Sequence, residues 1–293
     1  MSTSSKLTLG TAKLGLPKYG QSDGGVLKDP VDFILRSIDL GIRAVDTSPR
    51  YGNSEELIGE ALKQCNKIVF ISTKIDNITP NSFKTPKLMI DSINESIKKI
   101  GTNIDLCYLH QNEVEIISDK YVHEGIRQLK MNGLVKEVGT SVYSKEELKY
   151  TLDSGAFDWV QIPVNITDTS FYHEVSKHNS NIKVSARSVF LQGLLFSNQW
   201  VRNSIKDHTE LLRTLNTVKG LCSKFGITIQ QLTISYLSSL ERINQIIIGT
   251  ISDEKLTNNL SLENIQLDKQ LISDIDEISL LSKPWTNPRG WKL

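Results

Sequence analysis

Four titratable side chains have types and positions that suit proton transfer. Asp46 and Tyr51 lie five residues apart in the stretch 44–56, while Lys74 and His110 each stand at the end of a later apolar run. An ammonium beside a phenol favours the phenolate and lowers a pKa that is ordinarily about 10. A carboxylate keeps the ammonium charged, and a neutral imidazole holds a carbonyl oxygen near the phenol. Together these groups suit delivery of a proton to an oxygen that gains charge, as in carbonyl reduction.

Short apolar runs alternate along the chain with segments of helical periodicity. The runs are continuous and rich in β-branched residues, as expected for strands buried on both faces. They occupy residues 7–10, 42–47, 67–73, 104–110, 136–141, 159–163, 182–188 and 245–249. Predicted helices occupy residues 29–41, 53–65, 122–133 and 144–155, and about two more lie within 205–241. Asn53 and Glu56 have the spacing of a capping box at the start of the second helix.

The eight runs and their intervening helices predict one α/β domain over residues 1–293, folded as a closed (β/α)8 or TIM barrel. An open doubly wound sheet is the alternative. In a barrel the working residues lie at the carboxyl ends of the strands, so the four titratable side chains should meet at one mouth. The Gly-rich loop 14–25 follows the first strand, and we expect it to be mobile and to cover that mouth.

The composition is ordinary, with 39% hydrophobic and 23% charged residues and a net charge of +1. It therefore argues against a nucleic-acid partner or an anionic membrane surface. The three cysteines form no CxxC and have no metal-ligand spacing, so we predict reduced thiols and no metal. Without an apolar signal core or a transmembrane stretch, a cytoplasmic location is expected. The oligomeric state stays open between monomer and homodimer.

A carbonyl reduction needs a reductant, and the four residues do not supply one. The chain has no G-x-G-x-x-G fingerprint for a dinucleotide. The segment 246–260 is the best candidate for a phosphate site, because a strand ends at Gly249 and Ser252 is a good helix N-cap. The exposed amides of a helix start attract phosphate, and Lys255 adds a positive charge in the first turn.

Over nearly its whole length the chain resembles the aldo-keto reductase family. The resemblance is carried by DTSPRYGNSEELIGEAL, STK, DLCYLHQ, VKEVGTS, VQIPVN, ARSVFLQGLL and IIIGTISDEKLTNNL. It implies an eight-stranded barrel that binds a nicotinamide dinucleotide, usually NADPH, without a Rossmann domain. It also implies that Tyr51 is the general acid/base, that Lys74 and Asp46 tune it, and that His110 orients a small-molecule carbonyl substrate.

Further residues correspond by position to the family's cofactor contacts. Ser141 and Gln161 match residues that hold the nicotinamide carboxamide, and Arg187 takes the place of an aromatic residue that stacks on the ring. The remaining matches are Gly10 and Thr11 at the first strand, and Thr250, Lys255, Asn258 and Asn259 at the adenosine phosphate. Two departures are Val142, where an Asn is common, and Gly249, where a Lys is common. We predict NADPH as the cofactor, with NADH as the alternative.

The substrate pocket should be shaped by loops 14–25, 76–86 and 190–204 and by the tail 283–293. Trp285 and Trp291 either line this pocket or dock the tail on the barrel. The segments ARSVFLQGLL and NPRGW resemble a bacterial branch of sugar-related members, which suggests a sugar or sugar-derived carbonyl. Two other functions stay open: a lyase that forms a Schiff base on Lys74, and a redox-sensing or structural nicotinamide-binding barrel with little turnover.

Overall fold

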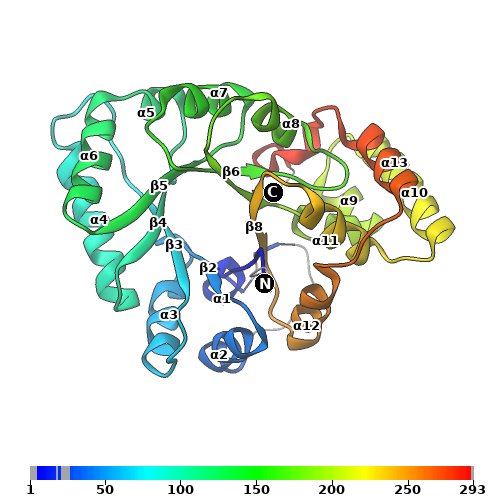
Figure 1. Ribbon diagram of the computed structural model, residues 1–293, viewed down its shortest axis with the longest axis horizontal. Helices are drawn as coiled ribbons and strands as arrows, with labels where there is room; N and C mark the ends of the chain where they lie inside the picture. The colour runs from blue at the N-terminus through cyan, green and yellow to red at the C-terminus, as the bar shows by residue number, and fades with distance from the viewer. Residues whose placement is uncertain (1–4, 18, 21–26, 292–293) are drawn as a thin grey trace.

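Eight parallel strands close into a barrel in which each strand pairs with the next and β1 pairs with β8 (Figure 1). The computed structural model describes residues 5–17, 19–20 and 27–291. The strands are β1 (Leu7–Gly10), β2 (Ala44–Asp46), β3 (Phe70–Ile75), β4 (Ile104–Leu109), β5 (Val135–Ser141), β6 (Trp159–Pro163), β7 (Lys183–Arg187) and β8 (Ile243–Ile248). The predicted (β/α)8 barrel is confirmed, and the β1–β8 pairing rules out the open sheet.

Helices surround the barrel on its outer side (Figure 1). They are α1 (Ala12–Gly15), α2 (Pro30–Leu40), α3 (Ser54–Lys63), α4 (Thr85–Ile100), α5 (Val114–Ile117), α6 (Lys120–Met131), α7 (Lys145–Ser154), α8 (Ser170–Lys177), α9 (Asn198–Ser204), α10 (Thr209–Phe225), α11 (Ile229–Ser239), α12 (Asp253–Leu262) and α13 (Lys269–Ser279). Short 3-10 turns are η1 (Leu191–Phe196), η2 (Pro284–Thr286) and η3 (Pro288–Gly290). None of the helices in the described part of the chain combines the length and apolarity needed to cross a bilayer.

The capping box predicted at Asn53 is wrong. Asn53 precedes α3, but its side chain makes no capping hydrogen bond, and its backbone (φ −94°, ψ 20°) is not extended as a side-chain cap requires. The chain enters α3 instead through a tight turn, in which the amide of Ser54 donates to the carbonyl of Tyr51 at 3.0 Å. The backbone that carries Tyr51 is thereby tied to the start of the helix.

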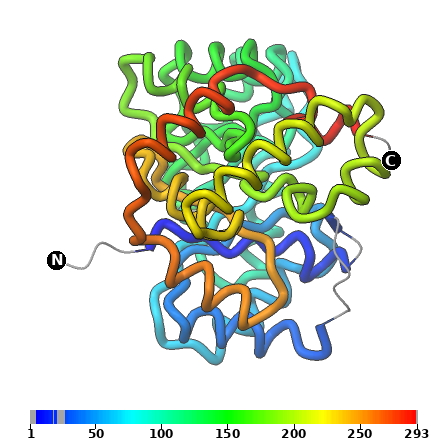
Figure 2. The backbone as a smooth tube through the Cα atoms, turned by 90° about the vertical axis from the view of Figure 1, so that its right-hand side faces the viewer, coloured from blue at the N-terminus to red at the C-terminus, as the bar shows by residue number. Residues whose placement is uncertain are grey.

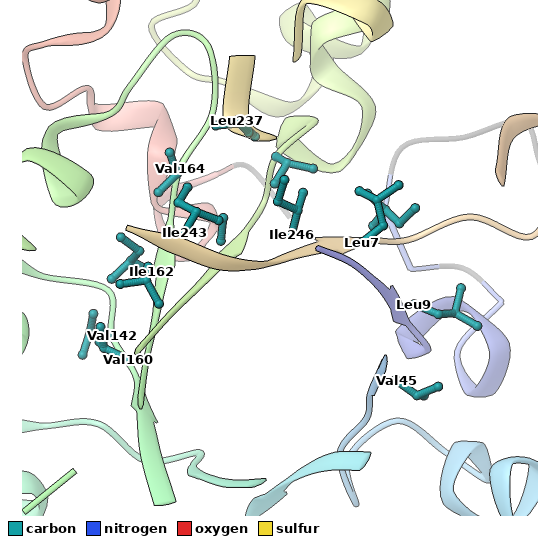
Figure 3. Close-up of a cluster of buried hydrophobic side chains, with 14 of the residues drawn as sticks. Leu7, Leu9, Val45, Val142, Val160, Ile162, Val164, Leu237, Ile243 and Ile246 are labelled. Carbon is teal, nitrogen blue, oxygen red and sulfur yellow. The ribbon is translucent and has the colours of Figure 1, made fainter. Parts of the chain in front are cut away.

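Side chains alternate along each strand between the helices outside and the barrel lumen. Leu9 and Val45 project outward into the main core, which the helices cover (Figure 3). A separate buried cluster of Leu106, Tyr108 and Trp159 lies on the other face of the strands and fills the lumen. Residues two positions further along these strands therefore face the lumen at its carboxyl end, where the site lies.

Close backbone contact fixes the loop that carries Tyr51 against α1. A Cβ added at Gly15 would lie 1.7 Å from the carbonyl oxygen of Tyr51, so only glycine fits there. Gly52 has a left-handed φ of 55°, which glycine adopts without strain, and packs against the carbonyl of Gly15. Two glycines thus position the phenol relative to the first strand.

The C-terminal segment is clamped to the barrel by the buried carboxylate of Asp168. One carboxylate oxygen accepts from the Ser170 amide at 2.9 Å and its hydroxyl at 2.7 Å. The other accepts from the Lys283 amide at 2.7 Å and the Thr286 hydroxyl at 2.5 Å. Figure 2 shows that the last described residues, in red, lie at the end of the barrel opposite to the start of β1.

Candidate active site

A cavity of about 420 Å³ lies at the carboxyl ends of the strands. All four predicted catalytic residues line it: Asp46, Tyr51, Lys74 and His110. So do eight of the nine predicted cofactor contacts, namely Gly10, Thr11, Ser141, Gln161, Arg187, Thr250, Lys255 and Asn259. Asn258 does not line the cavity and its side chain is exposed, because consecutive residues of α12 point in different directions. Strand-end convergence thus brings almost all of the predicted site together.

Lys74 and Asp46 form a buried ion pair at the floor of the cavity. Their Nζ and Oδ1 atoms are 2.8 Å apart, and their side chains are only 3% and 6% exposed. The ammonium also donates to the carbonyl of Thr47 at 2.8 Å. The register of the barrel explains the contact, because Asp46 pairs with Ser72 and Lys74 lies two residues further along the same face of β3. An ammonium held by two acceptors is poorly suited to attack a carbonyl, which argues against a Schiff base on Lys74.

Tyr51 is a buried phenol whose pKa lies well above its ordinary value. Burial is the main cause, and the carboxylate of Asp46 adds to it, while the guanidinium of Arg187 acts in the opposite direction. The expectation that Lys74 lowers this pKa is therefore wrong for the net shift. The ammonium lies 5.2 Å from the centre of the Tyr51 ring, but Asp46 balances its charge. Tyr51 consequently stays protonated at neutral pH and is available as a proton donor.

His110 follows β4 and is neutral at physiological pH. Burial lowers its pKa to about 4, with a further contribution from the positive charge of Lys74. Its Nδ1 lies 3.3 Å from the hydroxyl of Ser48. If that hydroxyl donates to Nδ1, the ring carries its proton on Nε2. A neutral imidazole in this place agrees with the role of a hydrogen-bond donor to a carbonyl oxygen.

A chain of hydrogen bonds joins Asp46 to two residues on neighbouring strands. The amide nitrogen of Gln161 donates to Oδ2 of Asp46 at 3.1 Å, and its oxygen accepts from the hydroxyl of Ser141 at 2.9 Å. Ser141 and Gln161 are also partners in the register of β5 and β6. The orientation of the Gln161 amide is therefore fixed by the same carboxylate that holds Lys74. No local sequence pattern indicates this link between segments 115 residues apart.

Arg187 lies at the end of β7 with its guanidinium against the ring of Tyr143, 3.9 Å from its centre. It donates to the carbonyl of Val142 at 2.7 Å. Arg289 of the tail stacks on the same ring at 4.0 Å, and two guanidinium groups this close to one ring centre must occupy opposite faces. The predicted stacking of Arg187 on a nicotinamide stays a prediction, since its observed partner is Tyr143.

The other end of the cavity contains the start of α12. Ser252 caps this helix by accepting from the amide of Lys255 at 3.3 Å, as its position in the sequence predicts. Asn259 lines the cavity and accepts from Gln230 of α11 at 2.8 Å. Gln230 and Lys13 also line the cavity, and neither was predicted as a site residue. Nothing marks them in the sequence, because each lies inside a helix without a motif.

Aromatic side chains form the outer wall of the cavity: Tyr19, Tyr143, Phe190, Phe196 and Trp200. The ring of Tyr19 lies 6.4 Å from that of Tyr51, and burial raises its pKa to about 12. Ser188, Leu191 and Gln192 have left-handed φ angles of 58°, 47° and 51°, which is unusual for residues other than glycine. These backbone angles give the segment after β7 a specific conformation, and this segment forms part of the cavity wall.

The predicted loops contribute only in part. Of loop 14–25, Tyr19 and Gly20 line the cavity, whereas residues 18 and 21–25 lie outside the described residues, so the predicted covering loop is not tested. Trp285 and Trp291 do not line it. Trp285 is buried and donates to the hydroxyl of Thr167 at 3.0 Å, so this residue docks the tail. Within the described ranges, no cluster of three metal-ligand side chains occurs.

The family model described as "Aldo/keto reductase family" matches residues 6–280 of the chain. An NADH-specific methylglyoxal reductase of Escherichia coli is 22% identical over 89% of this chain and 94% of its own length. D-arabinose 1-dehydrogenase of Saccharomyces cerevisiae is 25% identical over 90% of this chain and 84% of its own. L-galactose dehydrogenase of Arabidopsis thaliana is 23% identical over 97% of this chain and 95% of its own.

Solved structures share the fold. A glycerol dehydrogenase of Gluconobacter oxydans superposes with a TM-score of 0.72 at 20% identity, over 95% of this chain and 92% of its own. A thermostable aldo-keto reductase in complex with the inhibitor epalrestat gives a TM-score of 0.70 at 21% identity, over 94% and 95% of the two chains. At these identities the agreement establishes the barrel.

Proposed function

Since this chain belongs to the aldo/keto reductase family, we propose that it reduces an aldehyde or ketone with a nicotinamide dinucleotide, and that Tyr51 is the proton donor. One observation carries the proposal. The buried phenol, the Lys74–Asp46 pair and the neutral His110 line the same cavity as the start of α12, where a phosphate is expected.

The residues present fit a dinucleotide. Lys255 and the first-turn amides of α12 would take the adenosine phosphate, and Thr250 and Asn259 lie beside them on the cavity wall. Ser141 and Gln161 would hold the carboxamide at the other end, because their hydroxyl and amide lie together beside Asp46. The bound dinucleotide supplies the reducing equivalent that the side chains lack. We propose NADPH, on the charge of Lys255, with NADH as the alternative.

The protein's own groups then handle the proton. His110 donates a hydrogen bond to the carbonyl oxygen of the substrate and holds it near Tyr51. As that oxygen gains negative charge, the phenol transfers its proton to it, and the guanidinium of Arg187 stabilises the resulting phenolate. Burial keeps the phenol protonated until that moment.

A sugar or sugar-derived carbonyl is the proposed substrate class. Among the relatives are enzymes named for D-arabinose and for L-galactose, which are sugars. The aromatic side chains around the mouth, with Gln192 between them, offer apolar faces for C–H groups and an amide for hydroxyls.

The test is a turnover screen that follows nicotinamide absorbance with both cofactors against aldoses, ketoses and simple aldehydes. Tyr51→Phe should lower kcat by at least about a hundredfold, since general acid catalysis contributes about 10² to 10⁴. Its affinity for the cofactor should stay within about threefold of the wild type. Tyr150→Phe, on the exposed side of α7, is the matched control and should be fully active.

Undiminished turnover in Tyr51→Phe would remove Tyr51 as the acid. Tight cofactor binding with negligible turnover across the whole panel would instead favour the redox-sensing barrel. In the same assay, a higher kcat/KM with NADH than with NADPH would overturn the cofactor proposal.

A further inference from the structure

Arg187 brings into the cavity a positive charge that forms no ion pair with a carboxylate of the described residues. The residue is only 9% exposed. Its guanidinium donates to the carbonyl of Val142 and to the hydroxyl of Ser188 and stacks on Tyr143, all of which are neutral groups. Its Nε is buried and has no partner among the described residues. Such a buried and unpaired charge is costly and acts strongly on its surroundings.

The other cations near this end of the cavity differ in this respect. Arg289 stacks on the opposite face of Tyr143, but it is exposed to solvent, which screens its charge. Lys74 has Asp46 at 2.8 Å, so the two charges largely cancel for any group a few ångströms away. Lys255 belongs to α12 and is exposed. At the end of the cavity that contains Tyr51, the net field is therefore set in large part by Arg187.

We propose that Arg187 makes the cavity bind the reduced, uncharged nicotinamide more tightly than the oxidised, positively charged one. The inference rests on the proposed function, because it assumes that a nicotinamide dinucleotide binds in this cavity. It concerns a residue that selects the redox form of the cofactor, and it predicts that the enzyme works as a reductase and readily releases the oxidised form.

The position of Arg187 follows from the strand register. Gln161 of β6 pairs with Ser185 of β7, and Arg187 lies two residues beyond Ser185, opposite Pro163. Because side chains alternate along a strand, Arg187 faces the lumen as Ser185 does. A nicotinamide that serves the same carbonyl as Tyr51 must share the end of the cavity bordered by Tyr51, Gln161 and Arg187. The ring is neutral when reduced and carries one positive charge when oxidised, so the guanidinium repels only the oxidised form.

Isothermal titration calorimetry gives four dissociation constants for each protein: those of NADPH, NADP+, NADH and NAD+. They are measured for the wild type and for Arg187→Met. The wild type should bind the reduced form at least about tenfold more tightly, and Arg187→Met should reduce this preference by about tenfold, equivalent to about 1.4 kcal/mol. Arg187→Lys keeps the charge and should retain most of the preference.

Two controls separate this effect from damage to the site. Adenosine 2′,5′-bisphosphate has no nicotinamide, so its affinity should be the same in wild type and Arg187→Met within about twofold. Lys255→Met removes a cation at the other end of the cavity and should weaken the reduced and oxidised forms equally.

Three results would overturn the inference. They are a wild type that binds the oxidised form as tightly as the reduced one, an Arg187→Met variant with an unchanged preference, and an Arg187→Lys variant that loses the preference as fully as Arg187→Met. Failure of the wild type to bind any of the four cofactor forms is a different outcome, because it refutes the proposed function and the inference with it.

Discussion

Removing the carboxylate of Asp46 should destabilise the fold severely. Asp46 pairs with Lys74 at 2.8 Å in a place where both side chains are almost fully buried. Without it, the ammonium keeps only the carbonyl of Thr47, and the hydroxyl of Ser72 and the amide of Gln161 each lose an acceptor. Breaking a buried ion pair by removing one partner costs about 3 to 5 kcal/mol.

The expected shift in melting temperature follows from the length of the chain. Unfolding entropy of about 2.1 cal/mol/K per residue over 293 residues gives about 0.6 kcal/mol/K. Asp46→Ala should therefore melt about 5 to 8 °C below the wild type in a far-ultraviolet circular dichroism scan. The matched control is Asp91→Ala, which breaks an exposed pair with Lys87 and should shift the midpoint by less than about 2 °C.

A double variant separates the lone charge from the lost hydrogen bonds. Asp46→Ala with Lys74→Met removes both charges, and it should regain more than about half of the stability lost in Asp46→Ala, because no unpaired ammonium is left. The reasoning is refuted if Asp46→Ala melts within about 2 °C of the wild type. It is also refuted if the double variant is no more stable than Asp46→Ala.

Two further perturbations test other parts of the site. His110 has a pKa of about 4 in the fold and an ordinary value of 6.5, so the unfolded chain binds the proton between these pH values and the stabilisation is lost as pH falls through them. Denaturant titrations of the wild type should lose about 2 kcal/mol more between pH 7 and pH 5 than those of His110→Asn; equal losses would contradict the lowered pKa. Asp168→Ala leaves the Lys283 amide and the Thr286 hydroxyl without their acceptor and should cost about 2 to 4 kcal/mol, with a red shift of tryptophan emission as the tail releases Trp285. Asp274→Ala, on the exposed side of α13, should change neither quantity, and an unshifted emission in Asp168→Ala would show that the tail docks without this carboxylate.

Much of the fold was predictable because barrel strands are short, apolar and regularly spaced. β6 begins and ends where its apolar run does, and the break between α10 and α11 falls at Gly226, whose φ of 66° only glycine adopts easily. Helix α4, by contrast, was missed. Its start at Thr85 has no side-chain cap to mark it, although Met89, Ile93, Ile97 and Ile100 have the spacing of one helix face, and this face packs against α3 and α6.

The sequence predicts which residues lie at the carboxyl ends of the strands, and the site was predictable to that extent. Four titratable residues from three neighbouring strands had to meet, whatever their contacts. The contacts of Gln161 with Asp46 and of Arg187 with Val142 and Tyr143 depend on barrel closure and side-chain direction, which no local pattern encodes. A lowered pKa was predicted for Tyr51, whereas burial and the carboxylate of Asp46 raise it. The sequence does not show how deeply the phenol is buried or that Asp46 pairs with Lys74.

Burial acts on the two central proton-handling groups in opposite directions and leaves both of them neutral. It raises the pKa of Tyr51, so the phenol keeps its proton, and it lowers that of His110 to about 4, so the imidazole does not gain one. Two neutral hydrogen-bonding groups then stand between an ion pair whose charges cancel and the guanidinium of Arg187. Arg187 thus carries a charge that no ion pair compensates in the described part of the chain, and the four predicted catalytic residues supply the geometry in which that charge acts.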